Sequence, residues 1–90
     1  MNDKTQLISI SEIENRLCIF LRSNIIESKI EVNTSTSFSS LRVDSLSLVE
    51  MVLFIERQYK VSIPETELIP ENFKSVGTLA ACAYRCLQHA

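Results

Sequence analysis

The chain has 90 residues, 46% of them hydrophobic and 22% charged, and a formal net charge of −2. This length has room for one core, so we expect a single domain over residues 1–90 with a flexible segment at about 1–8. Nine basic residues scattered among eleven acidic ones exclude the concentrated positive charge that nucleic-acid binding requires. A substrate pocket would consume much of so small a core, so size favours a partner-binding module over an enzyme.

The three cysteines are odd in number and form no C-x-x-C pair; they are Cys18, Cys82 and Cys86. No segment resembles a signal peptide, and no apolar run approaches the roughly 20 residues of a membrane span. We therefore expect a cytoplasmic protein with free thiols. The only histidine, His89, stands at the fraying end of the chain, so a closed four-ligand zinc site is disfavoured and no metal is predicted.

One glycine and two prolines are too few for the many tight turns of a small sheet, which predicts an all-α fold. The first helix is predicted from about Ser11 to about Ser28. Its start is indicated by a capping box, Ser11-x-x-Glu14, and apolar residues follow at steps of three and four. The positions on this stripe are Ile13, Leu17, Phe20, Leu21 and Asn24.

A long loop and a second helix follow. The hydroxyl-rich run 33–40 disfavours helix, and we expect Phe38 and Leu41 to pin this loop to the bundle. The second helix is predicted from Asp44 or Ser45 to about Tyr59. Its core stripe consists of Leu48, Met51, Val52, Ile55 and Tyr59.

The opposite stripe of the second helix mixes leucines with charges: Leu46, Glu50, Leu53, Arg57 and Lys60, flanked by Glu56. Two leucines at spacing seven on a charged face indicate a docking surface. The alternative is that these leucines contact the long loop or another helix.

Two prolines and a serine divide the rest of the chain. We predict a short helix from Pro64 to Ile69, which Pro70 stops, and a last helix capped by Ser75. The apolar positions of the last helix are Val76, Leu79, Ala80, Ala83 and Leu87. The predicted architecture is a small four-helix bundle of three long helices and one short helix, with a long first loop.

The start of the second helix, Asp44-Ser45-Leu46, is the candidate centre of chemistry. With Asp44 as the N-cap, the Ser45 hydroxyl lies beside unpaired amides at the positive end of a helix dipole, which favours an attached phosphate. Asp44 repels such a phosphate unless a cation or basic partner is present. A hydrolytic Ser45 is not predicted, because the G-x-S-x-G elbow is absent. Simple capping by Asp44 is the alternative.

An ordered set of residues extends this motif in both directions. It is Phe38-x-x-Leu41-x-x-Asp44-Ser45-Leu46-x-x-Val49-Glu50, then Ile55-Glu56, then Ile63-Pro64. The set resembles the phosphopantetheine-binding carrier family, which includes acyl carrier proteins and the aminoacyl or peptidyl carriers of assembly lines. The resemblance covers nearly the whole chain, including the order of helices, the long first loop and the start of the last helix at Ser75.

This resemblance implies that Ser45 receives 4′-phosphopantetheine from coenzyme A through a phosphopantetheinyl transferase using Mg²⁺, with Asp44 and Leu46 completing the motif. The implied protein is a monomeric carrier, not an enzyme. It holds acyl or aminoacyl thioesters for loading, condensing and modifying enzymes of fatty-acid, polyketide or related secondary-metabolite biosynthesis. In such carriers the second helix is the recognition element, so the docking residues expected are Leu46, Ser47, Glu50, Leu53, Glu56 and Arg57.

The chain departs from the family pattern at several positions. Arg42 stands where glycine is common, and Ser47 where an acidic residue is common. Arg57 and Lys60 dilute the negative face, which indicates docking through shape and leucines more than through charge. The stretch 68–73 resembles carriers of dedicated secondary-metabolite or amino-acid-loading systems.

Two alternatives to a working carrier stay open from the sequence. The first is a helical adaptor that only binds proteins, with Asp44 and Ser45 as an ordinary cap. The second is a carrier-like protein whose serine is never modified. Within the carrier class, the sequence does not distinguish fatty acyl, polyketide or aminoacyl cargo.

Overall fold

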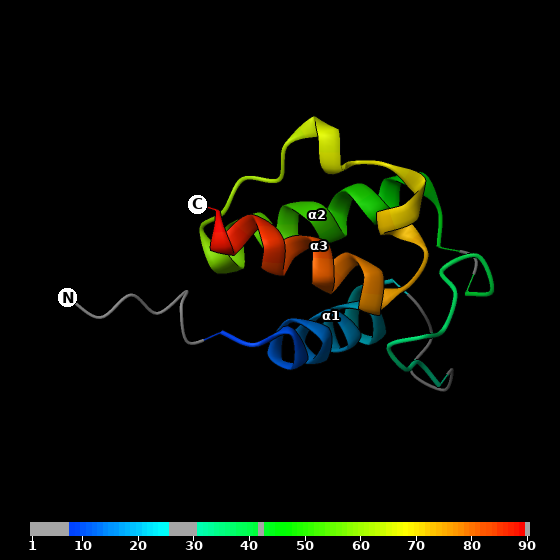
Figure 1. The fold of residues 1–90 in the computed structure, drawn as a ribbon. Helices are drawn as coiled ribbons and strands as arrows, with labels where there is room; N and C mark the ends of the chain where they lie inside the picture. The colour runs from blue at the N-terminus through cyan, green and yellow to red at the C-terminus, as the bar shows by residue number, and fades with distance from the viewer. Residues whose placement is uncertain (1–7, 26–30, 42, 90) are drawn as a thin grey trace.

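The protein is described by a computed structural model that covers residues 8–25, 31–41 and 43–89. Its elements are the helices α1 (Ile10–Asn24), α2 (Ser45–Tyr59) and α3 (Val76–Gln88), with two 3₁₀ turns, η2 (Glu65–Glu67) and η3 (Pro70–Phe73), between α2 and α3. In Figure 1, α1 runs opposite to α2 and α3, and segment 60–75 leads back to the end where α2 begins. The predicted all-α fold of three long helices is confirmed.

The first helix begins at Ile10, close to the predicted start at about Ser11, but its predicted cap is wrong by two residues. Ser9, not Ser11, is the N-cap of α1, because its hydroxyl accepts the backbone N–H of Glu12 at 3.2 Å. At the other end, the helix stops at Asn24, and the N–H of Ile25 caps it by donating to Leu21 O. The predicted extension to Ser28 falls on residues outside the described ranges.

The predicted helix from Pro64 to Ile69 is also corrected. Pro64 is the N-cap of the short η2 turn, and Pro70 opens a second turn instead of only stopping the first. Proline fits the first position of a turn, where no N–H is needed, and it holds the preceding Ile69 in an extended conformation (φ −118°, ψ 155°). Two short turns therefore replace one helix.

The core is formed by the inner faces of all three helices. On α2, Met51, Ile55 and Tyr59 are buried as predicted, whereas Leu48 and Val52 are half-buried. The predicted stripe of the last helix is buried throughout, and Ser75 caps it with a capping box to Thr78. The buried α1 residues are Ile13, Leu17, Cys18 and Leu21; of the predicted stripe, Phe20 is half-buried and Asn24 is exposed.

The loop before α2 is anchored on the start of α3. Phe38 is buried as predicted, and its N–H donates to Lys74 O at 2.8 Å. Gly77 donates its N–H to Thr34 O at 2.8 Å. A Cβ on Gly77 would lie 3.0 Å from that oxygen, so the chain's one glycine lies where the loop backbone closely approaches α3.

The ends of the chain add two observations. The expected flexible segment 1–8 lies outside the described residues except for Ile8, which is half-buried against the core. Across the described ranges, no helix has both the length and the apolar character that a bilayer span requires.

The two faces of α2 can be tested with one pair of alanine variants. Ile55→Ala removes a fully buried side chain and leaves a cavity, so we expect it to lower the free energy of unfolding by roughly 2–5 kcal/mol. Leu53→Ala, at a side chain that is 42% exposed, is expected to lower it by roughly 1 kcal/mol, because much of the removed surface already faces solvent. Urea titration followed by circular dichroism checks both values. Equal losses would contradict the assignment of the faces.

Candidate functional site

The site is built on the first turn of α2. The Asp44 carboxylate caps the helix by accepting the N–H of Ser47 at 2.8 Å, and Asp44 O accepts the N–H of Leu48 at 3.0 Å. The hydrogen bond from the Ser47 backbone holds the pKa of Asp44 below its usual value. Asp44 is exposed, so its charge faces solvent beside Ser45, the first helical residue.

A short chain of hydrogen bonds fixes the position of this turn relative to the start of α3. Phe38 is bonded to the start of α3 through its N–H, and its carbonyl accepts the N–H of Val43 at 3.0 Å. Val43 directly precedes the Asp44 cap. Ser45 is thus exposed at a fixed position on the surface. Its hydroxyl lies next to backbone amides that lack helical partners.

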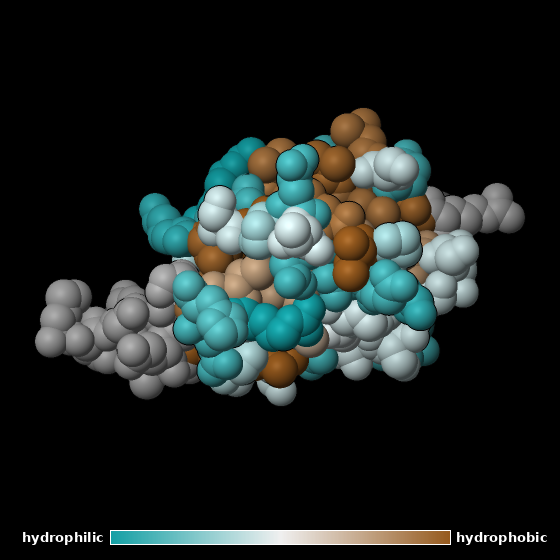
Figure 2. All heavy atoms as spheres, turned by 45° about the horizontal axis from the view of Figure 1, so that its top comes forward, coloured by the Kyte–Doolittle hydropathy of each residue, from teal (hydrophilic) through white to brown (hydrophobic). Residues whose placement is uncertain are grey.

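An apolar cleft of about 270 Å³ opens beside Ser45. One wall comes from α2, and the other comes from the segment between α2 and α3. Its lining residues are Ser45, Leu48, Val49, Val52, Leu53, Leu68 and Phe73. Figure 2, which tips the top of Figure 1 toward the viewer, shows apolar side chains gathered in the upper part of the molecule. The cleft offers an apolar surface to any group attached at Ser45.

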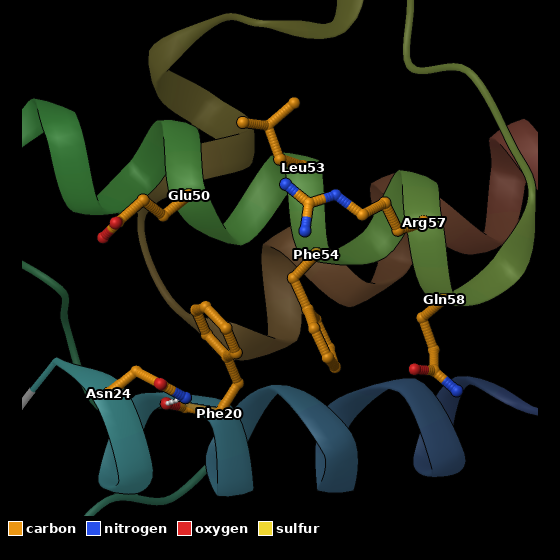
Figure 3. A pocket seen from close by; sticks show the side chains of 7 residues that line it. All are labelled: Phe20, Asn24, Glu50, Leu53, Phe54, Arg57 and Gln58. Carbon is orange, nitrogen blue, oxygen red and sulfur yellow. Dashed lines mark hydrogen bonds between the residues drawn. The ribbon is translucent and has the colours of Figure 1, made fainter.

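A second groove, of about 600 Å³, lies on the other flank of α2 against α1 (Figure 3). The rings of Phe20 and Phe54 stack between the two helices with their centroids 4.6 Å apart. Leu53 points away from α1, whereas Phe54 and Gln58 point toward it. The residues that line this groove are Phe20, Asn24, Glu50, Leu53, Phe54, Arg57 and Gln58.

The structure brings most of the expected docking residues onto one ridge of α2. Leu46 is 69% exposed, and Leu53 lies between the cleft and the groove because it lines both. Glu50 and Arg57 flank Leu53 and line the groove. Both leucines are exposed, at 69% for Leu46 and 42% for Leu53, although Leu53 shares the groove with residues of α1.

Two expected docking residues are engaged within the protein. Ser47 is half-buried, and its backbone N–H is taken by the Asp44 cap. The Glu56 carboxylate accepts the N–H of Ile63 at 2.8 Å, so it fixes the backbone of the segment that follows α2.

Sequence reasoning missed the second wall of the cleft. Leu68 and Phe73 come from the η2–η3 segment, and they lie 23 and 28 positions beyond Ser45 in the sequence. The only local signal is Leu68-Ile69, two large apolar residues directly before Pro70, both of them exposed. No periodicity links such a pair to the second helix, so their position beside Ser45 required the structure.

Burial makes the cysteine thiols poor nucleophiles. Cys18 and Cys82 are buried and Cys86 is half-buried, and burial raises the pKa of all three, that of Cys82 to about 12. His89 follows the far end of α3, opposite the end where α2 begins (Figure 1), so it cannot serve Ser45 as a base. Within the described ranges, no cluster of three or more histidine, cysteine, aspartate or glutamate side chains is arranged to hold a metal ion.

Comparison with known proteins points to one family. The phosphopantetheine attachment site family matches residues 23–83, which is most of the chain and includes the whole first turn of α2. The chain is 29% identical over 69 residues to aminoacyl carrier protein 2 of Bradyrhizobium diazoefficiens, covering 74% of this chain and 78% of that protein. It is 26% identical over 82 residues to aminoacyl carrier protein 1 of the same organism, covering 89% and 91%.

The cap at Asp44 predicts a specific pH dependence. A carboxyl whose pKa is lower in the folded state stabilises the fold above its unfolded pKa, and this stabilisation is lost as the pH falls through the folded pKa. We expect Asp44→Asn, which can still cap α2, to lack this dependence. The difference in unfolding free energy between wild type and Asp44→Asn should therefore shrink between about pH 5 and about pH 2. Urea titrations across this range measure it, and a constant difference would contradict the assigned cap.

Proposed function

Because the chain belongs to the phosphopantetheine attachment site family, whose prosthetic group is 4′-phosphopantetheine, we propose that Ser45 is the residue that bears this group. The observation that supports this proposal best is the exposed hydroxyl at the first position of α2, adjoining an apolar cleft. The residues fit the group. Helix amides and the dipole favour its phosphate, and the cleft offers an apolar surface to the carbon chain beyond.

The first role of the site is to accept the group. A phosphopantetheinyl transferase is the partner implied by the family. In the reaction we propose, Ser45 Oγ attacks the pantetheine-bearing phosphorus of coenzyme A, the pyrophosphate bond breaks, the nucleotide departs and the hydroxyl proton is released. Asp44 stays ionised beside Ser45 and attracts the divalent cation that offsets the charge of the incoming phosphate.

The second role is delivery, since members of this family are carriers and not enzymes. The attached arm supplies a thiol that holds cargo as a thioester at high effective concentration near a partner's active site. The chain itself contributes the docking surface. We propose that this surface is the ridge of α2, with Leu46 and Leu53 as apolar contacts and Glu50 and Arg57 as flanking charges of opposite sign.

We further propose that the cargo is an aminoacyl group. Both relatives described above are named aminoacyl carrier proteins. The cleft beside Ser45 is small, at about 270 Å³, and the core behind α2 is filled by the fully buried side chains Met51, Ile55 and Val76. A short cargo group suits this surface better than a long acyl chain, which needs a larger apolar site.

The free thiols and the docking ridge also bear on the cellular compartment and the oligomeric state. Free thiols suit the reducing cytoplasm, where we place this carrier. We also propose that it works as a single-domain monomer, because a docking ridge used by successive partners must stay accessible.

Mass spectrometry tests the attachment residue directly. Incubation with coenzyme A, Mg²⁺ and a broad-specificity phosphopantetheinyl transferase is expected to add one arm to the wild-type protein. Ser45→Ala should add none while keeping its circular dichroism spectrum, because an exposed side chain contributes little to the fold. Ser47→Ala, two residues along the same turn, is the matched control and should be modified. An unmodified wild type, or an arm on Ser45→Ala, would refute the assignment.

The cargo is tested on protein purified from its native host. Intact-mass measurement should show an amino-acid residue added to the arm, because thioesters survive mild acid. Treatment with hydroxylamine should remove the added mass and leave the arm in place. A fatty acyl or polyketide increment would contradict the aminoacyl proposal but not the attachment at Ser45. Protein from the host with no arm at all would point to a carrier that is never modified.

A further inference from the structure

We propose that Glu67 is a positioning residue that clamps segment 65–73 onto α3 and so holds Leu68 and Phe73 as the second wall of the cleft beside Ser45. The inference rests on the proposed function, because it takes Ser45 as the attachment residue. It assigns a role to a polar cluster that lies outside the attachment turn.

Three side chains meet at one oxygen of Glu67. Oε1 accepts from Arg85 Nη2 at 3.0 Å and from Asn72 Nδ2 at 3.1 Å, and the Cys82 thiol approaches it at 3.6 Å. The hydrogen bond from Arg85 holds the pKa of Glu67 below its usual value. The carboxylate therefore joins the 3₁₀ segment to side chains on two successive turns of α3.

Asn72 completes the clamp from the second turn. It is buried, its Nδ2 also donates to Glu67 O at 2.7 Å, and its Oδ1 accepts from Arg85 Nη2 at 3.3 Å. The Thr78 hydroxyl donates to Asn72 O at 3.2 Å. Hydrogen bonds between polar groups thus link η2, η3 and α3 to one another.

The segment has few internal bonds of its own. Each 3₁₀ turn is short, and Leu68 and Ile69 between the turns are 42% and 40% exposed, so burial of their side chains cannot fix the backbone there. Leu68 lies directly after Glu67, and Phe73 lies directly after Asn72. Glu67 and Asn72, which the clamp holds, therefore directly precede Leu68 and Phe73, which line the cleft.

Loosening the clamp should change docking and leave the attachment chemistry unaffected. The Asp44 cap and Ser45 are held by α2 and the preceding loop, which the clamp does not touch. A displaced Leu68 would alter the apolar surface that a partner meets beside Ser45. The side chains of this ion pair are 51% exposed for Arg85 and 33% exposed for Glu67, so water screens the pair, it contributes modestly to global stability, and the fold itself should persist.

The test uses the unmodified 90-residue protein as the substrate of a broad-specificity phosphopantetheinyl transferase. For Glu67→Ala and Arg85→Ala we expect the KM of the transferase for this protein to rise roughly fivefold with kcat unchanged. A fivefold change is of the size usual for the coupling between side chains of one hydrogen-bond network. The double variant Glu67→Arg with Arg85→Glu restores an ion pair, and the amide of Asn72 can turn to serve either charge, so KM should return toward wild type. Glu65→Ala, exposed on the same 3₁₀ turn, is the matched control and should behave as wild type.

A direct structural readout accompanies the kinetics. In NMR spectra, contacts between the methyl groups of Leu68 and Val49 or Leu53 should weaken in the two single variants while the melting temperature stays near that of wild type. If Glu67→Ala does not fold, the milder Glu67→Gln, which removes the charge and keeps an acceptor, takes its place together with the double variant.

The outcomes separate the two proposals. Wild-type KM and unchanged methyl contacts in the single variants would overturn the clamp and leave Ser45 as the attachment residue. A double variant with KM as high as either single variant would also overturn it. A wild-type protein that accepts no arm would overturn both proposals.

Discussion

The arrangement of the site depends on the contact between the first loop and the start of α3. Phe38 buries its ring in the core, donates its N–H to Lys74 O and accepts the N–H of Val43 through its carbonyl. These bonds fix the chain directly before the cap of α2. Without them, the long hydroxyl-rich loop would have to be ordered at an entropic cost that few contacts offset. A surface serine therefore has a defined position because a phenylalanine several residues earlier is buried.

The second helix divides its residues between two tasks. Met51 and Ile55 are fully buried and secure the helix to the core, which leaves Leu46 and Leu53 free to remain at the surface. The flanking charges, Glu50 and Arg57, are of opposite sign and stand seven residues apart, two turns of helix. On the proposed docking surface, a partner has to match an apolar ridge with one charge of each sign, and a purely basic partner surface would meet repulsion at Arg57.

The sequence predicts features that depend on residues close together in the chain better than features that depend on residues far apart. The bounds of α2, the Ser75 cap and the buried stripe of α3 follow from periodicity and capping, which act within a few residues. The Ser11 cap is wrong because Ser9 offers the same chemistry two residues earlier, and local rules do not choose between them. The cleft and the Glu67 cluster were missed because their partners lie far apart in sequence: Arg85 is 18 residues from Glu67. No local pattern encodes such a pairing.

The two walls of the cleft beside Ser45 therefore differ in how freely they can change. The wall of the cleft on α2 shares its helix with Ser45, so substitutions that move it also move this proposed attachment residue. In the proposed clamp, the wall formed by Leu68 and Phe73 is held through separate polar contacts of Glu67 and Asn72 to Arg85 on α3. Its shape can therefore change through Glu67, Asn72 or Arg85 without altering the Asp44 cap. For a carrier that must keep one attachment chemistry while matching different partners and cargo, the second wall is the part of the site that is free to adapt.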